Sequence, residues 1–420
     1  MTRVAFIING SPQSAMGYRA RALAKPLRDR FDIQLAYRGG NRVAALLRFV
    51  KFLAGSRPHL TYVFDMSYSG VLAAWFHRLL FRNRLVIETG DAIYELMRST
   101  GNRGRLGLSL TRLLENFSLR TADGIVVRSR NHQQLLEQRG IPADVVQDGV
   151  DTAEFRRQDV VELRRQHGLE GALVIGLVGS SIWSEKLGMC YGWELIELLR
   201  LLPDAPGDDT DGTNDTEGTS GTEGAKRVIG VIIGDGSGIP HLKARSREHG
   251  IEHRVRFLGR LPHEQLPRYL NLIDVCLSTQ TNDAVGQVRT SGKLPEYLAT
   301  GRYVLASEVG EAARVLPAQM LVPYDGVQDW NYPKKLAERV SAIMAQPERL
   351  ADGARNIAVA EEHFEYVKLA ARLGDVIEKI MKAERRQAAE SEAQAKSEPP
   401  ALAGGALTEP EARRKEHRTI

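Results

Sequence analysis

The stretch from Ser278 to Leu316 reads STQTNDAVGQVRTSGKLPEYLATGRYVLASEVGEAARVL, and the interpretation of the whole chain starts from it. Its first half is rich in polar residues and glycine, which is typical of a loop. Residues 293–300 then predict a short helix, and residues 303–306 predict a strand. Pro295 suits the first turn of that helix, and Gly301 suits its C-terminal end.

A helix start presents unpaired N–H groups and the positive end of a dipole, so an anion is favoured there. Lys293 adds a positive charge, and Ser291 and Gly292 precede it in the loop. Glu296 carries the opposite charge, which does not suit contact with phosphate. A carboxylate at this position is suited to accept hydrogen bonds from sugar hydroxyls. These four residues predict a binding site for the diphosphate and sugar of a nucleotide-sugar donor.

Residues 296–304 resemble the pattern Glu-Ala-Met-Ala-x-Gly-x-Pro-Val of the retaining glycosyltransferases of the GT4 family, with Tyr303 in place of proline. The resemblance implies the GT-B fold, an α/β fold in which two Rossmann-like doubly wound domains face a cleft. It also implies that Glu296 binds the ribose of the donor. In the family an earlier glutamate lies eight residues before, where this chain has Val288. Asp283 or Asn282 could take that role after an insertion.

A second part of the family pattern, Gly-Arg-x-x-x-x-Lys-Gly, is similar to residues 179–186, which follow a predicted strand at 173–178. The resemblance implies that Lys186 contacts the donor diphosphate. Ser180 stands where the family has arginine, so one cation is missing. Arg289 in the central loop could substitute for it.

Two glycine turns of the second half also match family loops. Gly234 and Asp235 follow the predicted strand 228–233, in a pattern that the family shows beside the donor base, and Gly310 corresponds to a loop near the phosphates. Tight turns between strands and helices explain these glycines equally well.

The first half opens with a predicted strand at 3–9, a loop at 10–17 and a helix at 18–30, which is the first unit of a doubly wound domain. Gly17 would let the backbone approach a ligand closely. The family's corresponding loop lies over the donor phosphates or beside the acceptor, so Gly17 and Arg19 are candidates for either contact, against a plain structural turn.

Asp91 follows the predicted strand 85–88, where an acceptor would sit in this fold. Many family members have a histidine just before this aspartate, whereas this chain has Gly90. Asp91 could orient the acceptor hydroxyl or cap the helix that follows.

The resemblance implies a mechanism based on electrostatics. Lys186, Arg289 and Lys293 would stabilise the departing diphosphate, and Asp91 would act at the acceptor. No residue presents itself as a covalent nucleophile, so we expect attack from the same face, with the leaving phosphate accepting the proton. We expect no metal and no cofactor besides the nucleotide-diphosphate sugar as co-substrate.

We expect residues 1–151 to form an acceptor-side domain and residues 152–365 a donor-binding domain. The segment 204–225 is acidic and rich in glycine and threonine, which predicts a disordered insertion. Residues 366–385 predict a helix that crosses back to the first domain, and residues 386–420 predict a disordered tail.

The chain has 420 residues, 43% hydrophobic and 26% charged, which is enough for two domains. Its two cysteines form no metal-ligand or disulfide pattern, so we expect a reducing, cytoplasmic location. The net charge is +5, but residues 1–150 hold 22 Lys and Arg against 11 Asp and Glu, which is +11. That half could face a phosphorylated or lipid-linked acceptor, or an anionic membrane through the helix predicted at 41–53. No basic motif interleaved with aromatic residues indicates nucleic acid.

Two other functions remain open at this point. Val288, Ser180 and Gly90 depart from polar positions of the family, which would suit a degenerate scaffold or binding subunit. Another GT-B enzyme, an inverting transferase or a sugar-nucleotide epimerase, is the second alternative. The expected role of the active enzyme is synthesis of a cell-surface polysaccharide or glycoconjugate.

Overall fold

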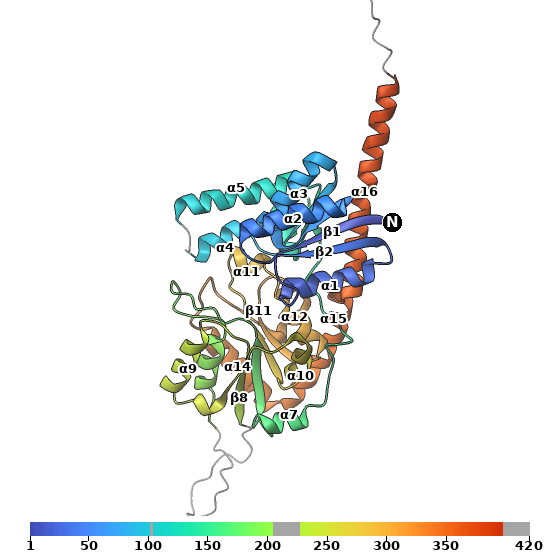
Figure 1. Cartoon of the computed structure of the whole chain (residues 1–420). Helices are drawn as coiled ribbons and strands as arrows, with labels where there is room; N and C mark the ends of the chain where they lie inside the picture. The colour runs from blue at the N-terminus through green and yellow to red at the C-terminus, as the bar shows by residue number, and fades with distance from the viewer. Residues whose placement is uncertain (101–103, 205–226, 398–420) are drawn as a thin grey trace, which may run out of the picture.

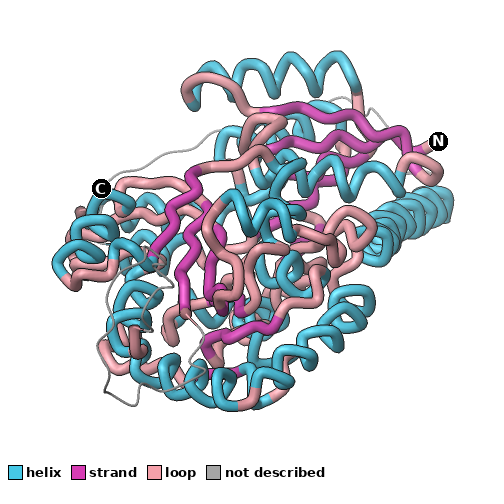
Figure 2. The backbone as a smooth tube through the Cα atoms, turned by 90° about the horizontal axis from the view of Figure 1, so that it is seen from below, coloured by secondary structure: helices cyan, strands magenta, loops and turns pink. Residues whose placement is uncertain are grey.

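The computed structural model describes residues 1–100, 104–204 and 227–397. These residues form two six-stranded parallel sheets, one above the other in Figure 1, with helices packed around each. Figure 2 shows the strands of both sheets enclosed by helices and loops. The arrangement confirms the predicted fold class, two doubly wound α/β domains. The predicted acidic insertion lies almost wholly outside the described residues.

The first sheet has the order β2-β1-β3-β4-β5-β6. Its strands are short apolar runs, and residues 4–8 of β1 are fully buried, as expected when helices cover both faces. The strands are β1 Thr2–Ile8, β2 Phe31–Tyr37, β3 Leu60–Val63, β4 Arg84–Thr89, β5 Gly124–Val127 and β6 Asp144–Val145. The helices are α1 Ala15–Leu27, α2 Arg42–Ser56, α3 Tyr68–Phe81, α4 Ile93–Thr100, α5 Arg105–Thr121 and α6 Arg130–Glu137.

The second sheet has the order β12-β11-β10-β7-β8-β9. Its strands are β7 Leu173–Val178, β8 Val228–Ile233, β9 Val255–Gly259, β10 Val275–Ser278, β11 Tyr303–Ser307 and β12 Leu321–Val322. Its helices are α7 Val161–Gln166, α8 Trp193–Leu201, α9 Ile239–Glu248, α10 Leu266–Leu270, α11 Ala284–Val288, α12 Lys293–Ala299, α13 Ala312–Val315, α14 Tyr332–Ala345 and α15 Asn356–His363.

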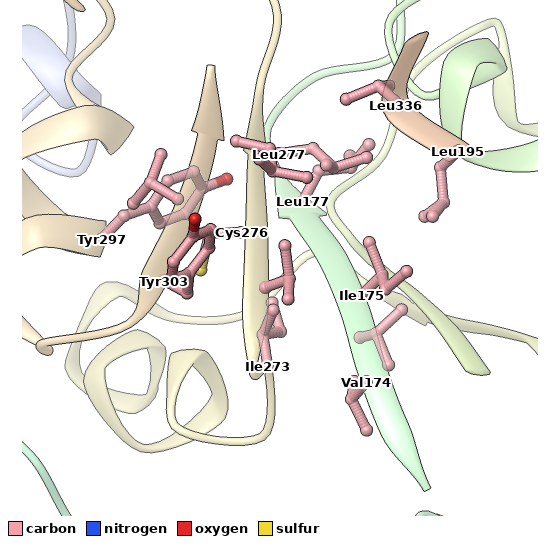
Figure 3. Close-up of a cluster of buried hydrophobic side chains, with 14 of the residues drawn as sticks. Val174, Ile175, Leu177, Leu195, Ile273, Cys276, Leu277, Tyr297, Tyr303 and Leu336 are labelled. Carbon is pink, nitrogen blue, oxygen red and sulfur yellow. The ribbon is translucent and has the colours of Figure 1, made fainter. Parts of the chain in front are cut away.

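The core of the second domain fixes the helix that carries Glu296. Figure 3 shows the ring of Tyr297 among the buried side chains between the strands, with Leu277 and Leu177 nearby. Tyr297 is fully buried, and its hydroxyl accepts a hydrogen bond of 2.7 Å from the backbone N–H of Val178 on β7. Because α12 is anchored in this way, its polar residues keep a fixed position relative to the end of β7.

The last helix, α16 Tyr366–Ser397, returns to the first domain, where it packs on α1. Directly before α16, Glu365 forms an isolated parallel bridge with Val150, which lies in the segment that connects the two domains. Seven residues of α16 from Tyr366 to Ile380 join the core around β1 and α1. The helix continues to Ser397, which corrects the prediction of disorder for residues 386–397; the rest of the predicted tail, 398–420, lies outside the described residues. Residues 386–397 are mostly Ala, Glu, Gln, Lys and Arg, which are strong helix formers, and proline first follows at 399.

Two other local predictions were wrong. Gly17 lies in the first turn of α1, because Ser14 caps that helix by accepting a hydrogen bond from the Gly17 N–H. A Cβ on Gly17 would lie 2.3 Å from the carbonyl oxygen of Ser11, so the glycine lets the preceding loop pack closely on the helix. The central loop contains the short helix α11, and Asp283 is its N-cap.

Candidate active site

A cavity of about 500 Å³ lies at the carboxyl ends of β7 and β10. This is the edge at which doubly wound sheets bind ligands. Five of the predicted site residues line it: Ser180, Arg289, Ser291, Gly292 and Lys293. The residues come from the loop after β7 and from the segment that runs from the end of α11 into the first residue of α12, which are distant in sequence.

Lys293 is the cation most closely held at this cavity. Its ammonium lies 3.4 Å from the centre of the Tyr191 ring, a cation–π contact. It also lies against the backbone of Gly179, where a Cβ would approach the ammonium nitrogen to 2.9 Å. Burial lowers the pKa of Lys293 to about 7, partly opposed by the carboxylate of Glu194. Ser180, the position at which the family pattern has its arginine, directly follows Gly179 in the sequence.

A buried hydroxyl of the cavity has an unused hydrogen bond. Among the described residues the Ser291 side-chain oxygen has no partner, although it is buried. Buried hydroxyl groups nearly always find a partner in a folded protein, so an unpaired one that lines the same cavity as Lys293 suggests a ligand.

The crossing of two loops explains Gly234. This glycine has φ 147° and lies on Gly179, since a Cβ there would be 1.9 Å from the Gly179 carbonyl oxygen. The carbonyl of Asp235 accepts a hydrogen bond of 2.8 Å from the N–H of Ser181. Gly234 and Asp235 therefore support the loop after β7 and do not line the cavity of about 500 Å³.

Glu296 lies half-buried on α12, outside the residues that line the cavity. Burial raises the pKa of its carboxyl to about 8, and Lys293 partly opposes the rise. Its side-chain oxygen lies 3.9 Å from the imidazole of His263, which packs on the Tyr18 ring of the first domain. Hydroxyl groups of a bound ligand would stabilise the charged carboxylate.

The other two predicted cations contact the first domain. Arg289 pairs with Asp91 at 2.8 Å, and the exposed Lys186 donates a hydrogen bond of 3.0 Å to the carbonyl of Ser99. Asp91 is not the cap of α4, because the carboxylate of Glu115 accepts from the first N–H groups of that helix. Arg289 and Asp91, proposed for opposite sides of the reaction, thus meet directly.

The residues proposed for the missing glutamate have local partners. Asp283 accepts from the N–H of Gly286, and the Asn282 amide donates to the Tyr324 carbonyl. Val288 is buried, and its carbonyl accepts a hydrogen bond of 2.6 Å from the Ser129 hydroxyl. Gly310, with φ 59°, packs on the carbonyls of Gly286 and Gln287 beneath α11.

Below the first-domain side of the cleft lies a buried charged network that sequence reasoning missed. Glu88 is fully buried and accepts from Arg19, Arg128 and the Tyr62 hydroxyl. The two guanidinium groups hold the pKa of Glu88 below its usual value despite burial. Arg19 is thus a buried structural partner here. Asp148 lies 3.5 Å from Arg19 and accepts from Thr290 of the second domain, so the network links both domains.

Arg128 explains the absent histidine. A Cβ on Gly90 would lie 2.5 Å from a nitrogen of the Arg128 guanidinium, so a larger side chain would displace it. Arg128 also pairs with Asp65 at 3.0 Å. The signal for this network in the sequence was weak, namely a glutamate at the end of a buried strand and an arginine at the end of another.

Two findings concern absences among the described residues. No cluster of three or more His, Cys, Asp or Glu side chains there could hold a metal ion. No helix in the described ranges has the length and apolar character needed to cross a membrane.

Comparison with known proteins places this geometry in a class. The two-sheet architecture is similar to GT-B structures: HepE from Anabaena bound to UDP-glucose has a TM-score of 0.68 and 17% identity over 90% of this chain and all of that one. Sucrose-phosphate synthase from Thermosynechococcus elongatus has a TM-score of 0.69 and 16% identity over 91% of this chain and all of that one.

Family models match both domains, a glycosyl transferase 4-like domain at residues 5–147 and glycosyl transferases group 1 at residues 223–346. The chain belongs to the group 1, GT4-like glycosyltransferases. A 2-deoxystreptamine glucosyltransferase from Streptomyces kanamyceticus is 28% identical over 270 residues, and the match covers 61% of each protein.

Proposed function

We propose that this protein transfers a sugar from a nucleoside-diphosphate sugar to a hydroxyl group of an acceptor held between the two domains, with retention of configuration. The observation that carries the proposal is Lys293, whose ammonium is fixed between Tyr191 and Gly179 at the cavity. The same cavity is lined by Ser291, whose buried hydroxyl has no partner among the described residues, and a desolvated cation there suits an anionic group of a ligand.

In the reaction, the bond between the anomeric carbon and the diphosphate oxygen breaks, and a bond from the acceptor oxygen to that carbon forms on the same face. The proton of the acceptor passes to the leaving phosphate oxygen. Lys293 and Arg289 stabilise the negative charge that develops on the diphosphate, and the Asp91 carboxylate orients the acceptor. Glu296 binds hydroxyl groups of the donor. Because Lys293 and Arg289 supply the positive charge that stabilises the diphosphate, we expect activity to persist in EDTA.

We infer that the donor nucleotide is UDP, since HepE, which shares the fold, has been described with UDP and UDP-glucose. We infer a sugar or a lipid-linked sugar as acceptor, in the synthesis of a cell-surface polysaccharide or glycoconjugate in the cytoplasm. The two buried free cysteines suit that reducing compartment.

The test uses the purified full-length chain with UDP-, GDP- and ADP-sugars, first by thermal unfolding and then by release of free nucleotide. A ligand that binds only the folded protein raises the melting temperature, so one nucleotide should stand out. Turnover lost in Lys293→Ala and Glu296→Gln, with both variants folded, would support the proposal. Binding of a nucleotide sugar without hydrolysis or transfer to any acceptor tried would instead support a scaffold.

A further inference from the structure

One face of the first domain is apolar and basic at the same time. The described residues include seventeen exposed large hydrophobic side chains, and ten of them lie on α2, α3 and α5. These three helices cover the same face of the first sheet, since their buried residues form one core cluster. Figure 1 shows them together on the side of the first domain that is turned away from the second.

The exposed apolar side chains follow helical spacing on each helix, so each set forms a stripe. On α5, Leu106, Leu110 and Leu113 are separated by four and three positions, and they are 88%, 55% and 63% exposed. The stripe of α2 consists of Val43, Leu47 and Val50, and that of α3 of Phe76, Leu79 and Leu80. We call these three stripes the apolar face.

The charge around the apolar face has a single sign. The exposed charged side chains of α2, α3 and α5 are all basic: Arg42, Arg48, Lys51, Arg105, Arg112 and Arg120. The one carboxylate on these helices, Glu115, is buried and bound by the N–H groups of Ile93 and Tyr94. The three helices therefore present apolar and cationic groups to solvent and no carboxylate.

We propose that the apolar face docks the protein on an anionic phospholipid bilayer. Leucine and phenylalanine side chains would enter the boundary of headgroups and acyl chains, while arginine and lysine contact lipid phosphates. A second copy of this chain fits less well, because two carboxylate-free basic faces would repel each other. The face is continuous with the acceptor side of the cleft, since α5 packs on α4, which starts just after Asp91.

The test is flotation of the full-length protein with vesicles of phosphatidylcholine alone and of phosphatidylcholine with 30% phosphatidylglycerol, at low and high salt. Wild type should float with the anionic vesicles, less so at high salt. The triple variant Leu47→Glu, Leu79→Glu, Leu110→Glu should lose more than about tenfold in binding. Its melting temperature should be unchanged, because the replaced side chains are exposed. The vesicles contain no nucleotide sugar, so the result is independent of the proposed catalysis.

Matched controls are Val161→Glu on α7 and Val367→Glu on α16, which place the same charge at exposed apolar positions outside the face and should bind vesicles as wild type does. In a second variant, Arg42→Gln with Lys51→Gln, binding should weaken about fivefold per residue removed. Equal flotation of wild type and the triple leucine variant would overturn the proposal. A wild-type dimer that the triple variant converts to monomer, without vesicle binding, would also overturn it and assign the face to a second copy.

Discussion

The guanidinium of Arg289 lies 2.8 Å from the carboxylate of Asp91, and this ion pair joins the two domains across 198 positions of sequence. Both partners remain partly exposed, at 47% and 25% of the side chain. Arg289 also lines the cavity at the end of β7, so the same guanidinium is within reach of both the first domain and that cavity.

Removal of Asp91 is expected to strengthen the binding of UDP. Asp91→Asn releases Arg289 from its carboxylate, so the guanidinium can turn fully to the diphosphate. A partly exposed pair of this kind contributes up to about 1 kcal/mol, which limits the gain in affinity to about fivefold. Calorimetric titration with UDP measures it. Glu95→Gln, which removes a carboxylate of α4 paired with Arg98, is the matched control and should not change the affinity. An unchanged affinity in Asp91→Asn would mean that Arg289 does not reach the diphosphate.

Lys293 is expected to matter more for donor binding than Lys186. Lys293 lines the cavity, whereas Lys186 is exposed and bonded to Ser99. Lys293→Ala should weaken UDP binding by about 1.5–3 kcal/mol, the range for a hydrogen bond to a charged group, and Lys186→Ala by less. Uridine, which has no phosphate, is the control ligand, and its affinity should be the same in both variants and wild type. If Lys186→Ala weakened UDP binding more than Lys293→Ala did, the diphosphate would be assigned to the loop around residue 186.

The affinity for UDP is expected to fall as the pH rises above 7. The pKa of Lys293 is lowered to about 7 in the free protein, and a bound diphosphate must raise it, so binding takes up a proton. Affinity is therefore highest below pH 7 and decreases up to the pKa of the bound state. Titrations from pH 7 to 9 should show this slope, and Lys293→Met should flatten it. The ionisation of Glu296 near pH 8 falls in the same window, so Glu296→Gln must be titrated as well. A slope that persists in Lys293→Met would assign the proton to another group.

Glu296 is also expected to limit stability. Its carboxyl has a folded pKa of about 8, above that of an unfolded chain, so ionisation disfavours the folded state. The penalty begins above the unfolded pKa and is complete above pH 8. Glu296→Gln should therefore be more stable than wild type at pH 8.5, by at least about 1 kcal/mol, and equal to it near pH 4.5. Unfolding by urea at the two pH values measures the difference. If Glu296→Gln were less stable than wild type at pH 8.5, the raised pKa of Glu296 would be contradicted.

The buried strands were the part of the structure that sequence could predict. The runs at 173–178 and 228–233 are apolar and covered on both faces, and their predicted bounds are those of β7 and β8. The short helix α12 was equally predictable, because proline and glycine mark its two ends. α11 was not, since five residues capped by Asp283 carry too little pattern to distinguish them from a loop.

The sequence singled out five residues that line the cavity, but it did not predict how their side chains pair. Ser180 and Lys293 were both singled out, yet only the folded chain shows that the lysine lies against Gly179, the residue just before the position of the missing arginine. Arg289 had been considered for that place, but an ion pair with Asp91 depends on the packing of two domains. Partners so distant in sequence leave no local pattern.

The buried network around Glu88 gives the last prediction. Glu88 accepts from Arg19, Arg128 and Tyr62, so Glu88→Ala would leave two buried guanidinium groups without their central partner. Breaking a buried ion pair costs about 3–5 kcal/mol, and we expect a loss of stability of this size in urea unfolding. The lowered pKa of Glu88 adds a pH dependence, since its contribution is present above the unfolded pKa and is lost as the pH falls through the folded value. Glu162→Ala, which breaks an exposed pair with Arg165, is the control and should cost less than about 1 kcal/mol. A small effect in Glu88→Ala would mean that the two arginines find other partners, and Asp148 is the carboxylate that lies near enough to both.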